Sequence, residues 1–78
     1  MSRVMSRWDI EAILNKELHK HTACAACLFV GFDAWNGEDT VFDHLDVEGN
    51  GVPETVYGPI VEKIIAEAKC TYEDVDVE

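Results

Sequence analysis

Positive charge is missing from the middle of this chain, which has no Lys or Arg between His21 and Glu62. In all 78 residues, six Lys and Arg stand against sixteen Asp and Glu, and the formal net charge is −10. Proteins that bind nucleic acids or anionic membranes use basic side chains to neutralise phosphates. The charge pattern therefore argues against direct binding to nucleic acid or to a membrane.

Long apolar runs and a disulfide framework are missing as well. No run approaches the roughly 18 apolar residues that span a bilayer, and the N-terminus has no continuous apolar signal region. The three cysteines are an odd number with one close pair, Cys24 and Cys27, which is not typical of a secreted disulfide-bonded protein. We therefore expect reduced thiols and a cytoplasmic location.

Catalytic motifs are also absent. The sequence has no Gly-rich phosphate loop and no nucleophile elbow, and His44 between Asp43 and Asp46 is a weak acid–base arrangement. These absences predict a protein that is not an enzyme and that needs no cofactor.

The chain length allows one core, so we expect a single domain over residues 1–78. A hydrophobic content of 47% indicates that most of the chain folds. A core of this size contributes only about 3–5 kcal/mol of net stability, which would make a homodimer a natural supplement. The acidic tail, residues 73–78, is expected to be mobile.

Two helices are predicted, one near each end of the chain. The first should begin at the capping box formed by Ser6 and Asp9. The second should run from Pro53 or Pro59 onward, with its start near Pro59 or a kink there, because proline is best tolerated in a first helical turn. The apolar stripe of the first helix is Ile10, Ile13, Leu14 and Leu18, and that of the second is Val56, Tyr57, Ile60, Val61, Ile64, Ile65, Ala68 and Tyr72.

A β-hairpin is predicted between the helices, with strands in 27–35 and 40–47. Asn36-Gly37 favours a two-residue type I′ turn, which would pair Trp35 with Glu38. The predicted core face then carries Leu28, Val30, Phe32, Val41, Asp43 and Leu45. Because Asp43 fits that face poorly, a bulge or a longer turn is the alternative. A short third strand could lie near Val52, so the expected fold is α+β with the order αββ(β)α.

A metal or thiol site is the alternative function that the sequence offers. His19, His21, Cys24 and Cys27 are all zinc-ligand types close together in the chain. Residues two apart on a helix differ by roughly 200° in direction, so His19 and His21 could share an ion only if the helix had ended. We therefore expect that the protein binds no metal. A zinc or thiol site formed by these four residues is the alternative.

The acidic hairpin is the main candidate for a working surface. Carboxylates on one face of a strand recur about every 6.6–7 Å, a spacing that can imitate a nucleic-acid backbone toward a basic groove. Solubility or salt adaptation would give the same composition and stays open as an alternative. The candidate partner-binding residues are Asp33, Trp35, Glu38, Asp39, Phe42, Asp43, Asp46 and Glu48. Among them, Trp35 and Phe42 are aromatic anchors on the face opposite the predicted core face.

The run from Val52 to Ala68, with an earlier capped helix and with Cys24 before an apolar strand, resembles small uncharacterised bacterial αββα proteins. By size and charge the whole chain is also similar to phage-encoded inhibitors of the anti-CRISPR type, several of which mimic DNA. That resemblance implies a non-enzymatic inhibitor of a protein with a basic, nucleic-acid-binding surface.

Overall fold

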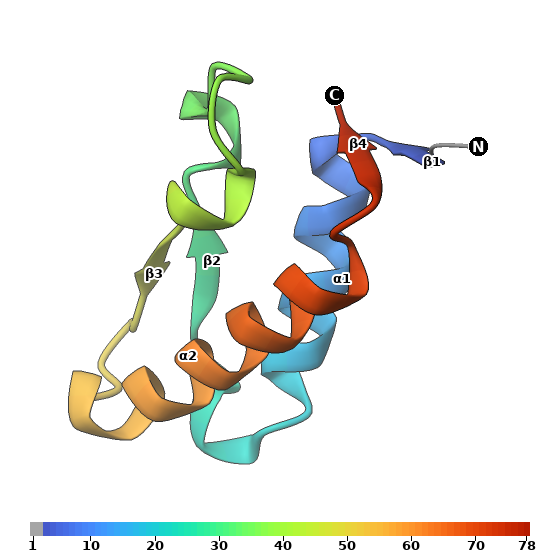
Figure 1. The fold of residues 1–78 in the computed structure, drawn as a ribbon. Coiled ribbons are helices and arrows are strands. Elements are labelled where there is room, and N and C mark those ends of the chain that lie inside the picture. Colours follow the sequence, from blue (N-terminus) through green and yellow to red (C-terminus); the bar gives the residue numbers. More distant parts are fainter. Residues whose placement is uncertain (1–2) are drawn as a thin grey trace.

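The computed structural model describes residues 3–78, which form helices and short strands in an α+β arrangement with two small sheets (Figure 1). The α+β class is therefore confirmed. None of the helices in the described part of the chain is long and apolar enough to cross a membrane. The elements are β1 (Arg3–Met5), α1 (Arg7–His19), a 3₁₀ turn at Thr22–Cys24, β2 (Leu28–Val30), 3₁₀ turns at Phe32–Ala34 and Val41–Asp43, β3 (Asp46–Glu48), α2 (Glu54–Thr71) and β4 (Val75–Val77).

Helix α1 begins where the capping box predicts. Ser6 is the extended N-cap residue, and its hydroxyl oxygen accepts a hydrogen bond from the Trp8 N–H at 3.0 Å. Such a cap stabilises a helix by about 1 kcal/mol. The apolar stripe faces inward as expected, because Ile10, Leu14 and Leu18 are all buried.

Helix α2 begins at Glu54, more than a turn before Pro59, and carries that proline inside it. Proline has no N–H, so the Thr55 carbonyl lacks its usual i+4 donor. The burial of Val61, Ile64 and Ala68 further along the helix supplies the apolar contacts that offset this loss.

The predicted hairpin turn is wrong, although the two segments do pair in the antiparallel sense. The register is Leu28 with Glu48, Phe29 with Val47 and Val30 with Asp46, so Trp35 and Glu38 are not partners. Asn36-Gly37 instead lies within a loop over residues 31–45 that contains two 3₁₀ turns. A tight hairpin would send about half of the apolar side chains to solvent. The loop buries Phe32, Trp35, Val41 and Phe42, and it packs Leu45 partly buried against the core.

The inward face of β2 is also the opposite of the predicted one. Phe29 is only 2% exposed, whereas Leu28 is 39% exposed. Asn15 of α1 helps to fix this orientation, because its side-chain oxygen accepts the Phe29 N–H at 2.8 Å. Asp43, which fitted the predicted core face poorly, is exposed at the end of a 3₁₀ turn.

No strand forms near Val52, and the additional strands lie at the two ends of the described chain. β1 and β4 pair in parallel, with Arg3 opposite Val75 and Met5 opposite Val77. The tail that we expected to be mobile therefore contains a strand. Its last residue is bonded further, because the Arg7 N–H donates to the Glu78 carbonyl at 2.8 Å.

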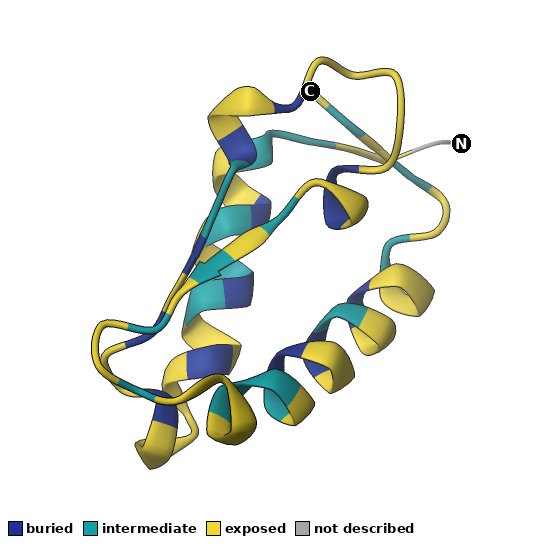
Figure 2. Cartoon of the chain, turned by 90° about the vertical axis from the view of Figure 1, so that its left-hand side faces the viewer, coloured by how far each residue is buried: buried dark blue, intermediate teal, exposed yellow. Residues whose placement is uncertain are grey.

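The core lies between the two helices, β2 and the loop over residues 31–45. Figure 2 shows the buried residues on the inner sides of both helices, while the outer sides are exposed. Leu14 and Leu18 of α1, Phe29 of β2 and Phe32 of the loop are among its most buried members. This core leaves the outer face of β2 and β3 and the acidic part of the loop open to solvent.

Candidate partner-binding surface

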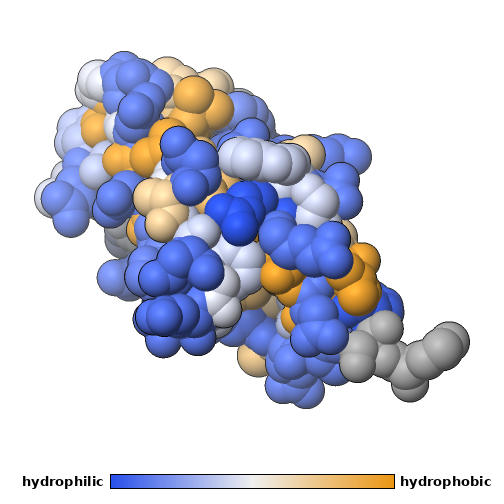
Figure 3. Space-filling view, turned by 90° about the horizontal axis from the view of Figure 1, so that it is seen from above, coloured by the Kyte–Doolittle hydropathy of each residue, from blue (hydrophilic) through white to orange (hydrophobic). Residues whose placement is uncertain are grey.

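All six acidic residues predicted to bind a partner are exposed. They come from two places, the loop over residues 31–45 and strand β3, and not from one regular hairpin. Figure 3 views the molecule from above and shows a mostly hydrophilic surface with smaller hydrophobic patches. The loop contributes Asp33, Glu38, Asp39 and Asp43, and β3 contributes Asp46 and Glu48.

The two β3 carboxylates form the most regular part of this acidic surface. Asp46 and Glu48 are two residues apart on one strand, so they share a face about 6.6–7 Å apart. Val47 between them points inward and packs on the core. Leu28 and Val30 are the cross-strand neighbours of the two acids. The outer face of this sheet therefore presents two carboxylates beside apolar side chains.

Two of the loop acids have basic partners. Asp43 forms an ion pair with Lys69 of α2 at 2.7 Å, and the Asp39 carboxylate lies 3.3 Å from His44 Nε2. Within residues 3–78, Asp33, Glu38, Asp46 and Glu48 have no ion-pair partner. The net negative potential of the surface therefore comes mainly from these four residues, and from Asp39 as well whenever His44 is neutral.

Trp35 and Phe42 do not have the role of exposed anchors that the sequence predicted. They are only 7% and 6% exposed. The Trp35 indole N–H donates to the Asp39 carbonyl, and the Arg7 guanidinium lies 5.0 Å from the centre of the ring. Phe42 stacks on Tyr72 with ring centres 6.4 Å apart. Both aromatic residues are buried and hold the longer loop against the core. In a two-residue hairpin they would have been on the exposed face.

The alternative metal site is not assembled. His19 uses Nε2 in a 2.7 Å hydrogen bond with the Cys27 carbonyl, and Cys24 and Cys27 are fully buried. Burial, together with the neighbouring Cys24, raises the pKa of the Cys27 thiol, which disfavours the thiolate that zinc requires. In the part of the chain that the structure describes, no group of three or more His, Cys, Asp and Glu side chains could hold an ion.

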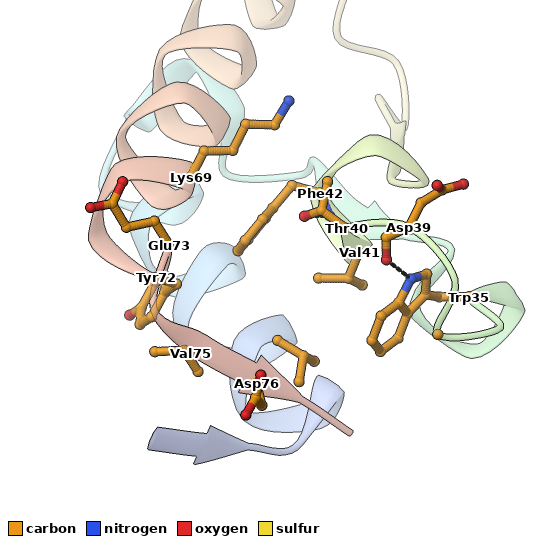
Figure 4. A pocket seen from close by; sticks show the side chains of 12 residues that line it. Trp35, Asp39, Thr40, Val41, Phe42, Lys69, Tyr72, Glu73, Val75 and Asp76 are labelled. Carbon is orange, nitrogen blue, oxygen red and sulfur yellow. Dashed lines mark hydrogen bonds between the residues drawn. The ribbon is translucent and has the colours of Figure 1, made fainter. Parts of the chain in front are cut away.

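A cavity of about 490 Å³ is the feature that the sequence reasoning missed. Its walls come from the loop over residues 31–45, the end of α2, and β4 (Figure 4). Trp35, Val41, Phe42 and Tyr72 supply an apolar lining, and Lys69 lies at its edge. The alternation of Val75, Asp76 and Val77 is a strand signal that could have indicated the third wall.

Comparisons with protein-family models, with curated proteins and with solved structures found no match to this chain.

Proposed function

We propose that this chain is a small acidic binding protein without enzymatic activity, an inhibitor of the anti-CRISPR type that occupies the basic, nucleic-acid-binding surface of a protein partner. The observation that carries this proposal is the exposure of all six loop and β3 carboxylates in a stretch that has no Lys or Arg. A partner with a basic groove would meet carboxylates here in place of phosphates.

The arrangement of these carboxylates supports a role in recognition. Asp46 and Glu48 are fixed on a strand, so a partner would find them at a constant spacing. Asp33 lies in a 3₁₀ turn that is held by buried Phe32. Acids held by a folded scaffold lose less conformational entropy on binding than acids in a flexible tail.

The proposal is tested by capture from a cell lysate on the immobilised protein, followed by elution with duplex DNA. We expect nucleic-acid-binding proteins to be retained at low salt and released by DNA. We also expect their release at about 1 M salt, where the Debye length is only about 3 Å. Retention that resists both DNA and salt would contradict charge mimicry.

A pair of matched variants separates the β3 carboxylates from total charge. Asp46→Lys with Glu48→Lys reverses the β3 pair, while Glu62→Lys with Glu67→Lys makes the same charge change on exposed positions of α2. The β3 variant should lose the captured proteins and the α2 variant should keep them. Equal loss in both variants would mean that net charge alone accounts for capture.

A further inference from the structure

Strand β4 has one edge that is paired and one that is open. Its only strand neighbour within residues 3–78 is β1. The Glu78 N–H donates to the Met5 carbonyl, and the Glu78 carbonyl accepts the Arg7 N–H, both at 2.8 Å. Successive residues of an extended chain direct their N–H and C=O groups to opposite sides. The N–H and C=O groups of Val75 and Val77 therefore point away from β1. The Val75 N–H already donates to the Tyr72 carbonyl at 3.1 Å, so the N–H of Val77 is the donor that this edge leaves open.

The open edge of β4 borders the cavity described above. Val75, Asp76 and Val77 all line it. In Figure 4, β1 lies on one side of β4, while Val41 and Phe42 lie on the other side. Backbone groups that can pair with a strand and a partly apolar hollow that can take a side chain therefore occur together.

The edge of β2 shows how this protein closes a strand edge elsewhere. The Phe29 N–H, which lies on the side of β2 away from β3, donates to the Asn15 side chain at 2.8 Å. Covering an edge in this way prevents pairing with other chains. No comparable side-chain bond reaches the Val77 backbone within the described residues. The β4 edge is thus available to a further strand.

The charge around the cavity indicates what kind of strand would fit. Asp39, Glu73 and Asp76 lie among its lining residues. Lys69 is the one basic side chain that lines it among the described residues, and that amine already forms an ion pair with Asp43. A basic segment would be attracted to this rim, whereas a second copy of the chain would bring a further net charge of −10.

We propose that the β4 edge and its cavity bind an extended segment of a partner protein, in which an apolar side chain that enters the cavity is flanked by Lys or Arg. The segment adds to β4 as a strand, in the manner of other β-augmentation complexes. This inference goes beyond the proposed charge mimicry, because imitation of a nucleic-acid backbone needs neither an open strand edge nor a cavity.

The test is an NMR titration of the whole protein with the acetylated and amidated peptide Lys-Val-Lys-Val-Lys. We expect saturable shifts of the Val77 amide and the Trp35 indole N–H, and slower hydrogen exchange at the Val77 amide. The peptide Glu-Val-Glu-Val-Glu has the same length and alternation, so it is the control, and it should not bind.

Two pairs of variants test the backbone and the charge separately. Val77→Pro removes the outward N–H and should weaken peptide binding about tenfold, the loss expected for one backbone hydrogen bond. Val77→Ala keeps that N–H and should weaken binding less. Glu73→Lys should weaken binding about fivefold, while Glu62→Lys, the same change far along α2, should have little effect. Circular dichroism checks that each variant is folded.

Several results would overturn this inference. One is the absence of peptide binding, and another is binding that Val77→Pro and Glu73→Lys leave unchanged. A third is hydrogen exchange at the Val77 amide that becomes slower as the protein concentration rises in the absence of peptide. That result would assign the β4 edge to a second copy of the chain. The charge-mimicry proposal is tested apart from this one, because Asp46→Lys with Glu48→Lys should abolish DNA-sensitive capture and leave peptide binding to β4 intact.

Discussion

Gly31 combines a left-handed backbone with a close backbone contact, so its replacement is poorly tolerated. It has a φ of +99°, and a Cβ atom at this position would lie 2.8 Å from the His44 carbonyl oxygen. We expect Gly31→Ala to lower the free energy of unfolding by about 2–3 kcal/mol. Alanine is strained in the left-handed conformation, and its Cβ would also be too close to the His44 carbonyl oxygen. Urea denaturation, followed by circular dichroism, measures this loss.

Gly37 provides the matched control for that contact. Its φ is +88°, but no atom lies within 4 Å of a Cβ built there. Gly37→Ala should therefore cost only the conformational term, about 1–2 kcal/mol. If both variants lose the same stability, the backbone around His44 must relax freely, and the close approach of Gly31 would have no structural importance.

Cys27 gives the fold a dependence on alkaline pH. Burial first, and then the neighbouring Cys24, raises the pKa of its thiol above the usual value. The folded state therefore holds the proton more tightly than the unfolded state. The stability contributed by the neutral thiol is complete below the pKa of the unfolded chain, about 8.5, and is lost as the pH rises through the folded pKa.

The comparison of wild type with Cys27→Ala isolates this effect from the titration of Lys and Tyr. The difference in free energy of unfolding between the two proteins should shrink as the pH rises from about 8 to about 10. A constant difference for Cys27→Ala across this range would mean that the buried thiol does not ionise differently in the folded and unfolded states.

At the scale of elements, Arg7 joins three segments that are distant in sequence. From the first turn of α1, its Nη1 donates to the Phe32 carbonyl at 3.0 Å and to the Trp35 carbonyl at 2.7 Å. Its Nε donates to the Glu78 carbonyl at 3.3 Å. A guanidinium can make these bonds at once because its donors lie in a fixed plane. Arg7 therefore fixes the loop over residues 31–45 and the end of β4 to α1.

Arg7→Lys should destabilise the protein by about 1–3 kcal/mol, since a single ammonium cannot replace the three carbonyl contacts together with the stacking on Trp35. Arg3→Lys changes an exposed ion pair with Asp74 and should cost less than about 1 kcal/mol. Thermal unfolding monitored by tryptophan fluorescence measures both. Equal losses would show that Arg7 contributes charge only.

The helices could be predicted because their signals are local. Ser6 and the spacing of Ile10, Leu14 and Leu18 act within a few turns of one helix. The Asn36-Gly37 signal is equally local, but it was overridden by the burial of Trp35 and the other large apolar side chains of the loop. Local turn chemistry is worth less than the burial of several aromatic side chains.

The pairing of β1 with β4 could not be predicted from either segment. It joins Arg3 to Val75 across almost the whole chain, and each strand has only three residues. The alternation of Val75, Asp76 and Val77 indicates a strand, but its place beside the loop over residues 31–45, and hence the cavity, could not be predicted for the same reason. The exposure of acids such as Asp46 and Glu48 was predictable because ionised side chains are rarely buried without partners.

At the scale of the whole molecule, most of the negative charge is not neutralised. The four ion pairs within residues 3–78 use only four of the sixteen carboxylates, and all of these pairs involve exposed side chains. Such pairs contribute little, with a median of about 0–1 kcal/mol. A net charge of −10 on a chain of this size therefore destabilises the folded state through self-repulsion.

Added salt should stabilise this protein, and the shape of the increase distinguishes screening from salt adaptation. Screening of self-repulsion should raise the free energy of unfolding by about 1 kcal/mol and then level off near 0.5 M NaCl, once the Debye length is shorter than the distance between most charges. A protein adapted to high salt would continue to gain stability at molar concentrations. Asp46→Asn with Glu48→Gln should reduce the initial gain, because both acids lie on the exposed face of β3. A flat response would mean that the carboxylates are too far apart to repel one another, and a continued rise would favour salt adaptation over a partner-binding surface.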